Sequence, residues 1–181
     1  MKKVLSIVAV AALMLFAGKA NAQISIHAGY QNYTITSHTE ILGVSNDASD
    51  SEAGFYVGAT YDYTVGGGLG VAPGLYFAYV EDVMDLRLPI LLNYGINMDE
   101  LGISVFAGPQ INFGVAGDIY GDDNSNYNRF DLGVTFGLQL SFKNIYLEGG
   151  YTMGLLNRWK DAPADCNMKA NQLFFGVGYG L

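Results

Sequence analysis

The stretch FYVGATYDYT (Phe55 to Thr64) decides the fold, because its side chains alternate between two kinds. One set of alternate residues is apolar or aromatic. The other set is small or polar and includes one charged residue, Asp62. Alternation with a period of two is typical of a β-strand with two different faces. The fold class therefore depends on which of these two faces meets water.

The chain begins with a segment that we interpret as a secretory signal peptide. Lys2 and Lys3 precede an apolar run over residues 4–16, which is too short for a helix that spans a bilayer. A small-residue cleavage pattern follows, and we predict cleavage between Ala22 and Gln23. The predicted organisation is a cleaved signal peptide, residues 1–22, and one domain, residues 23–181.

Composition excludes several classes of function. The chain has 9 basic and 17 acidic side chains and a formal net charge of −8. It therefore lacks the basic surface that nucleic-acid binding requires. Cys166 is the single cysteine, so an intrachain disulfide and a thiolate metal site are both excluded. After residue 22 no apolar run is long enough to predict a transmembrane helix.

Segments with period two recur along the domain, and their connections alternate in length. We predict short turns at residues 66–68, 99–101 and 143–144, and a medium connection at 81–85. Long polar loops are predicted elsewhere, at residues 37–52, 117–128 and 159–170. Short turns at one end and long loops at the other are typical of outer-membrane barrels. The predicted strands are 23–36, 53–65, 69–80, 86–98, 102–116, 129–142, 145–158 and 171–181.

A soluble secreted barrel of lipocalin type would also show eight alternating strands. Its water-exposed face should be about a quarter to a third charged, whereas the polar face here is mostly Gly, Ser, Thr, Asn and Gln. The apolar face is also too bulky for the narrow interior of an eight-stranded barrel. We therefore predict an all-β fold: a closed eight-stranded antiparallel up-and-down transmembrane barrel. Its bulky face would meet lipid, and it would have short periplasmic turns and longer extracellular loops.

The inverted barrel places the few charged side chains of the strands in the lumen. An unpaired charge there is costly, so we expect hydrogen-bonded pairs, with His27 as the partner of Asp62. Inward aromatic residues would complete a plug, and we predict no stable conductance. The alternative is a narrow transport barrel for small solutes. The predicted polar network is His27, Asp62, Arg87, Arg129, Asp131 and Glu148, and the predicted aromatic plug is Tyr56, Tyr76, Phe106, Tyr146 and Phe174.

Other candidate sites are weaker. The loop GDDNSN (residues 121–126) offers oxygen ligands of the kind that Ca²⁺ prefers, with Asp118, Asp122 and Asp123 as candidates, but it lacks the spacing of an EF-hand. Ser37, His38 and Glu40 are types found in hydrolases, yet adjacency in sequence is not the geometry of a triad. We therefore predict no catalytic residue, no cofactor and no resident metal. A solvated loop is the simpler interpretation of the acidic residues.

Four segments carry a resemblance to a known family: LRLPILLNYG (86–95), VFAGPQINFG (105–114), RFDLGVTFGLQL (129–140) and LEGGYTMGLLN (147–157). They resemble the small outer-membrane β-barrel domain proteins of Bacteroidetes, the porin-family or PorT-like group, which are eight-stranded barrels of OmpA/OmpX type. The terminus QLFFGVGYGL is similar to the signal that the barrel-assembly machinery reads.

The resemblance implies a place in the bacterial outer membrane, among lipid and lipopolysaccharide, and insertion by the assembly machinery. We expect a structural or interaction role, either in envelope integrity or in presenting acidic extracellular loops to an envelope protein partner. A minor alternative implied by the resemblance is an accessory component of type IX secretion.

Overall fold

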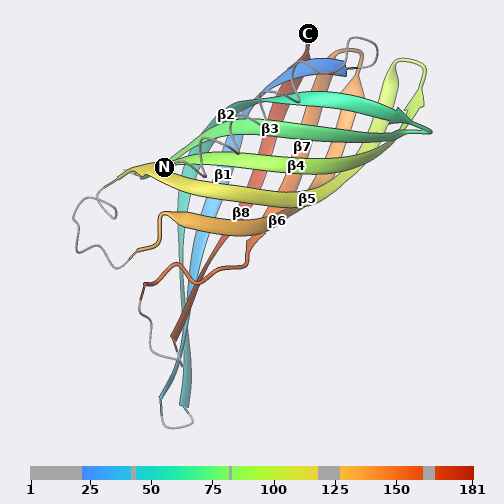
Figure 1. Cartoon of the computed structure of the whole chain (residues 1–181). Helices are drawn as coiled ribbons and strands as arrows, with labels where there is room; N and C mark the ends of the chain where they lie inside the picture. The colour runs from blue at the N-terminus through green and yellow to red at the C-terminus, as the bar shows by residue number, and fades with distance from the viewer. Residues whose placement is uncertain (1–21, 42–43, 82, 118–126, 161–165) are drawn as a thin grey trace, which may run out of the picture.

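Eight antiparallel strands form a closed barrel, with each strand paired to its neighbours in sequence and β8 paired to β1 (Figure 1). The computed structural model describes residues 22–41, 44–81, 83–117, 127–160 and 166–181. The predicted fold class is confirmed. The strands are β1 (Ala22–Ile41), β2 (Val44–Gly66), β3 (Leu69–Val80), β4 (Val83–Met98), β5 (Leu101–Ala116), β6 (Phe130–Phe142), β7 (Ile145–Gly154) and β8 (Cys166–Gly180).

The two faces of the sheet are arranged as in a membrane barrel. Phe55 and Val57 of the opening stretch are 59% and 53% exposed, whereas Tyr56 and Thr60 between and beyond them are 5% exposed. The same division holds around the barrel, where the most buried large side chains are polar. Such a surface is stable only where lipid replaces water around the apolar side chains. The fully buried polar set is Gln31, Gln172, Asn112, Thr152, Asp131 and Ser25.

The short turns follow the prediction, and each is made possible by its backbone. Gly67 and Gly68 take positive φ values of 60° and 82°, and Asp99 and Lys143 take 54° in the other two turns at this end. The β3–β4 connection at the opposite end is tighter than predicted, because β4 begins at Val83. We call these two ends of the barrel the short-turn end and the long-loop end.

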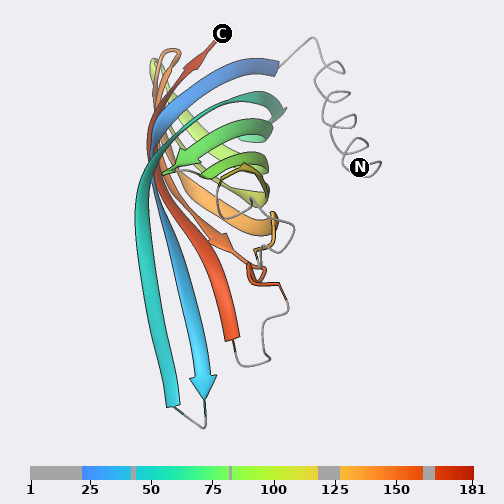
Figure 2. The ribbon, with the colours of Figure 1, turned by 90° about the vertical axis from the view of Figure 1, so that its left-hand side faces the viewer.

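The predicted long loop over residues 37–52 is wrong. β1 and β2 instead stay paired from Ala22↔Tyr63 to Ile41↔Val44, and their hairpin projects far beyond the barrel (Figure 2). The alternation of apolar and polar residues ends near Glu52 because the strands there have left the apolar layer. Loss of the hydrophobic pattern therefore does not mark the end of a strand here.

β8 extends in the same direction. It begins at Cys166, earlier than predicted, and pairs with β1 as far as Thr39↔Cys166. β7 by contrast ends at Gly154 and not at 158. The result is a three-stranded sheet beyond the barrel, in the order β2–β1–β8, which we call the outer sheet. It comprises residues 44–53 of β2, 32–41 of β1 and 166–170 of β8.

Ala22 and Gln23 form the start of β1, and residues 1–21 lie outside the described part. Signal-peptide cleavage at this bond therefore stays a prediction. Within the described ranges, no helix is long and apolar enough to cross a bilayer.

Candidate functional site in the barrel lumen

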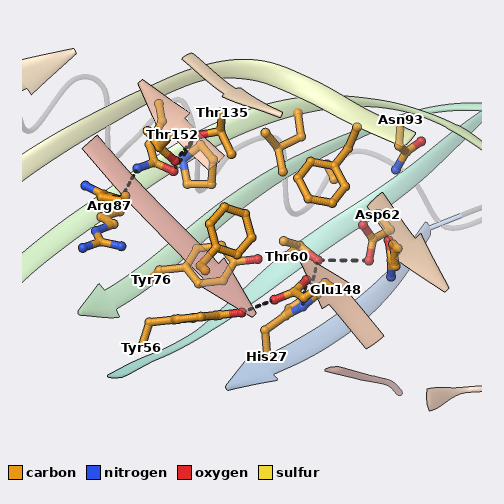
Figure 3. Close-up of a pocket in the computed structure, with 18 residues that line it drawn as sticks. His27, Tyr56, Thr60, Asp62, Tyr76, Arg87, Asn93, Thr135, Glu148 and Thr152 are labelled. Atoms are coloured by element: carbon orange, nitrogen blue, oxygen red, sulfur yellow. Dashed lines mark hydrogen bonds and ion pairs between the residues drawn. The ribbon is translucent and has the colours of Figure 1, made fainter. Parts of the chain in front are cut away.

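We call the half of the lumen nearer the short-turn end the inner half, and the half nearer the long-loop end the outer half. The inner half is built around the carboxylate of Glu148 on β7. Its Oε2 lies 3.0 Å from Nδ1 of His27 on β1, and its Oε1 accepts a hydrogen bond of 2.7 Å from the hydroxyl of Tyr56 on β2. The side chains of His27 and Glu148 are only 5% and 7% exposed. Nε2 of His27 lies 3.0 Å from the hydroxyl of Thr60 (Figure 3). Three strands thus contribute to one buried cluster, which ties β7 across the lumen to β1 and β2.

Asp62 joins this cluster indirectly. Its Oδ2 accepts hydrogen bonds from Ser25 at 2.6 Å and from Thr60 at 3.0 Å. Asp62 is therefore a lumen carboxylate with partners, but the predicted direct pair with His27 is wrong. The register explains the difference: His27 lies opposite Gly58, so Asp62 lies further toward the short-turn end, and Thr60 bridges the two.

Aromatic side chains occupy the middle of the lumen. Tyr56 packs against Tyr76 at a ring distance of 5.9 Å and edge-on against Phe174 at 6.0 Å, and Phe174 stacks on Phe106 at 6.3 Å. The fifth predicted plug residue, Tyr146, stacks on His27 nearer the short-turn end at 6.4 Å. The cavity left between these groups measures about 60 Å³. That volume matches about two water molecules.

A second polar layer lies toward the long-loop end. Arg87 donates to Oε1 of Gln31 at 2.5 Å, which links β4 to β1 across the barrel. Gln110 donates to Asn112 at 2.7 Å and accepts from Thr135 at 3.0 Å. All of these side chains are at least nine-tenths buried. A polar layer linked by hydrogen bonds therefore crosses the outer half of the lumen and borders the central cavity.

Two buried charges of this layer were missed by the sequence analysis. Asp85 is 4% exposed and attracts Arg87, although it was assigned to an exposed acidic connection. Arg158 is 3% exposed and attracts Asp131, which is 1% exposed. The four charges balance as two positive and two negative. In the predicted strand 145–158, Arg158 falls on the same face as Glu148, because every second residue of a strand shares a face. The sequence therefore contained a signal that Arg158 points inward.

The backbone around Arg158 joins two other segments at the long-loop end. The amide of Asn128 donates to the carbonyl of Arg158 at 2.8 Å, and the amide of Arg158 donates to the carbonyl of Met168 at 2.9 Å. Tyr127 and Trp159 form an isolated antiparallel bridge beside this contact. Residues that were predicted as strand end and loop thus fold back over the mouth of the barrel.

Arg129 does not belong to the lumen network. It is exposed, and its guanidinium lies 3.5 Å from the carbonyl oxygen of Val115. β6 begins only at Phe130, so the inward phase of the strand does not extend to Arg129. The other five predicted residues of the network, His27, Asp62, Arg87, Asp131 and Glu148, all point into the lumen.

The short-turn end is open. A polar vestibule of about 550 Å³ reaches inward from the turns, with Lys143 and Tyr146 among its lining residues. Asp62, Asn93 and Gln139 line both this vestibule and the central cavity. The lumen is therefore accessible from the short-turn end as far as the His27–Glu148 cluster, and only the central cavity of about 60 Å³ lies beyond that point.

The remaining candidates from the sequence fall outside the described part. The loop with Asp118, Asp122 and Asp123 is not described, and neither are the side chains of His38, Glu40 and Cys166. Among the described residues, no three His, Cys, Asp or Glu side chains are arranged to hold a metal ion.

Comparison with solved structures assigns the fold. The chain has the fold of integral outer-membrane barrels of OmpA/OmpX type. Neisserial surface protein A matches with a TM-score of 0.53 and 16% identity over 88% of this chain and 98% of that one. The outer-membrane enzyme PagL matches with a TM-score of 0.53 and 14% identity, covering 81% and 97%. OprG of Pseudomonas aeruginosa matches with a TM-score of 0.50 and 12% identity, covering 91% and 98%.

These identities show the fold and not the activity. One of the neighbours is an enzyme, so the fold is compatible with enzymatic and non-enzymatic roles. No protein-family model matches the chain, and no curated protein matches it. The finer resemblance to the Bacteroidetes group stays a prediction.

Proposed function

We propose that this outer-membrane barrel does not conduct solutes, and that it serves as a membrane anchor for the outer sheet. Its role is then an interaction or structural role at the cell surface. The observation that carries the proposal is the contrast between the two ends of the molecule. The outer half of the lumen is crossed by the layer around Arg87 and Gln110, whereas three strands continue past it into the outer sheet.

The polar layer resists opening because its charges are balanced and buried. Moving Arg87 or Arg158 aside would separate it from the carboxylate that attracts it, Asp85 or Asp131. Separating opposite charges in a poorly hydrated lumen costs free energy, so the closed arrangement is favoured. An eight-stranded barrel also leaves little lumen beyond its side chains.

The second candidate function is transport of small solutes, and the vestibule is the observation that favours it. A solute entering from the short-turn end would meet Asp62 and then the His27–Glu148 cluster, so a small cation would be admitted most readily. We rank this second because the path stops at the aromatic layer and the Arg87 layer.

A planar-bilayer measurement separates the two functions. We expect the purified protein to show no discrete openings in 1 M KCl, and the Arg158→Ala variant to show small or transient ones. Lys143→Ala at the exposed short-turn end is the matched control and should be as silent as the wild type. Stable, cation-selective openings of the wild-type protein would overturn the anchor function and support transport.

We also propose that the barrel is not an enzyme. Thr60, His27 and Glu148 lie in the order of a nucleophile, a base and an orienting acid, with 3.0 Å between neighbours. However, the hydroxyl of Thr60 is also 3.0 Å from the carboxylate of Asp62. A negative charge at that position opposes the oxyanion that acyl transfer would develop. Covalent labelling of Thr60 by a serine-hydrolase probe, detected by mass spectrometry, would contradict the proposal that the barrel is not an enzyme.

The partners of the membrane-spanning part follow from its surface. The exposed apolar belt suits lipid and lipopolysaccharide, and the C-terminal Gly176 and Tyr179 suit recognition by the barrel-assembly machinery. Both remain proposals, as does a link to type IX secretion. Recognition by the barrel-assembly machinery can be tested by depleting cells of that machinery and measuring assembly of the protein into their outer membrane. Loss of assembly would support the proposal.

A further inference from the structure

We propose that the free edge of β2 in the outer sheet, residues 44–53, binds an extended basic segment of another protein, which adds to the sheet as a fourth strand. This inference rests on the proposed function in one respect, since it takes the outer sheet to be the part of the protein that binds a partner. The test is nevertheless independent of whether the lumen conducts.

The edge is free because the barrel partner of β2 stops early. β2 pairs with β1 along its whole length, but its pairing with β3 begins only at Gly54↔Val80. Residues 44–53 therefore have one ladder neighbour among the described residues, and alternate backbone amides and carbonyls face away from β1. Such a row of groups is a template for adding an extended chain.

The opposite edge of the same sheet is covered. Residues 166–170 of β8 lie past the end of their pairing with β7, which stops at Met153↔Asn171. The backbone of Met168 is nevertheless occupied, because its carbonyl accepts from the amide of Arg158 at 2.9 Å and its amide donates to Oδ1 of Asn157 at 3.1 Å. Within the described chain, the two edges thus differ, and the β2 edge is the accessible one.

The β2 edge lacks three features that commonly protect edge strands, namely Pro, Lys and a bulge, and the charges that it carries are all acidic. Acidic charges oppose the addition of an acidic strand but favour a basic one. The segment VSNDASDSEA (44–53) contains neither Pro nor Lys, and the register shift of β2 lies far away, between Thr64 and Gly66. The segment contains no aromatic residue.

Charge determines which partner fits. Asp50 and Glu52 lie on the edge strand, and Glu81 lies at the β3–β4 turn beside it. Repulsion from Glu81 raises the pKa of Glu52, and Asp50 adds to the effect. These three carboxylates lie outside the membrane-spanning part, and they repel one another in the absence of a cation. A strand carrying Lys or Arg would relieve that repulsion, whereas a second copy of the same acidic edge would increase it.

The experiment uses the full chain in lipid nanodiscs and a labelled peptide of alternating Lys and Thr as the probe, at low salt. We expect saturable binding, measured by fluorescence anisotropy, and slower amide hydrogen exchange in residues 44–53 but not in 166–170. A peptide of the same sequence with alternate backbone nitrogens methylated keeps its charge but cannot pair along one edge. It should bind at least tenfold more weakly.

Two controls address the alternatives. The double variant Asp50→Asn, Glu52→Gln keeps the shape of the edge and should weaken binding of the Lys-Thr peptide several-fold, while a Glu-Thr peptide should not bind the wild type. Equal binding of the methylated and unmethylated peptides would overturn strand addition, since charge alone would then explain the affinity. Protection of 166–170 instead, or concentration-dependent dimerisation of the chain through residues 44–53, would also overturn it. A conducting wild-type barrel would refute the anchor function and leave these results unaffected.

Discussion

The lumen cluster makes a quantitative prediction, because Glu148 is the acceptor that joins two other strands. Its side chain is 7% exposed, and it has contacts of 3.0 Å to His27 and 2.7 Å to Tyr56. Removing the acceptor leaves two buried groups without their hydrogen-bond partner, at about 1–3 kcal/mol each. We therefore expect Glu148→Ala to lower the free energy of unfolding by about 2–6 kcal/mol. Glu148→Gln keeps the shape and an acceptor and should cost about 1–3 kcal/mol.

A double-mutant cycle isolates the pair. The free energy of unfolding is measured by reversible urea titration in lipid vesicles for the wild type, His27→Ala, Glu148→Ala and the double variant. Residues in direct contact couple, and we expect a coupling energy of about 1.5–3 kcal/mol. Gln139→Ala is the matched control: Gln139 faces Glu148 in the register but makes only a 3.5 Å contact with Ser104. Its variant should cost less than about 1 kcal/mol. Additive effects of the two main variants, within about 0.5 kcal/mol, would refute the assignment of this pair.

Three further predictions concern the lipid face, the strand packing and the edge. Leu138→Arg, on the exposed face near the middle of β6, should cost about 2–4 kcal/mol in vesicles, whereas Leu101→Arg at the short-turn end should cost about 0–1 kcal/mol. Gly108→Ala should prevent folding, as judged by heat-modifiable gel mobility, because a Cβ at this position would collide with the carbonyl oxygen of Ile90. Binding of the Lys-Thr peptide should weaken as the pH falls, because the raised pKa makes Glu52 lose its charge earlier than an ordinary Glu and the cationic strand requires the ionised form. Isothermal titration at several pH values would measure this, and affinity that is constant with pH would contradict it.

The fold was predictable because the bilayer imposes a strict rule on each strand. Lipid on one side and a narrow lumen on the other force every second residue into one of two chemistries, as in Phe55 and Tyr56. The same rule has no force beyond the membrane. Residues 37–41 and 44–52 continue as strands although apolar and polar residues no longer alternate in their sequence, so nothing in the pattern distinguished a ladder from a loop.

The members of the lumen network were predictable, but their partners were not. Successive side chains of a strand point to opposite faces, so the alternation within one strand is enough to assign a residue to the interior. His27, Asp62 and Glu148 were assigned in this way, without any knowledge of the neighbouring strands. Which inward side chains meet depends on the register between strands and on contacts across the barrel. His27 meets Glu148, on β7, although β7 is not a ladder neighbour of β1. Arg158 depends on a loop that folds back over the mouth, and such backbone geometry is not encoded in a period of two.

The position at which the β2 edge becomes free connects the fold with the proposed role. Inside hydrocarbon every backbone group must be paired within the protein, so a barrel can have no open edge there. β2 keeps its β3 partner up to Gly54↔Val80, and Phe55 is the last large apolar side chain exposed on β2 at this end among the described residues. The unpaired edge thus begins where the apolar belt ends, at the point where water can satisfy the backbone. A strand that is free only in water is tolerated by the membrane and remains available to a partner outside it.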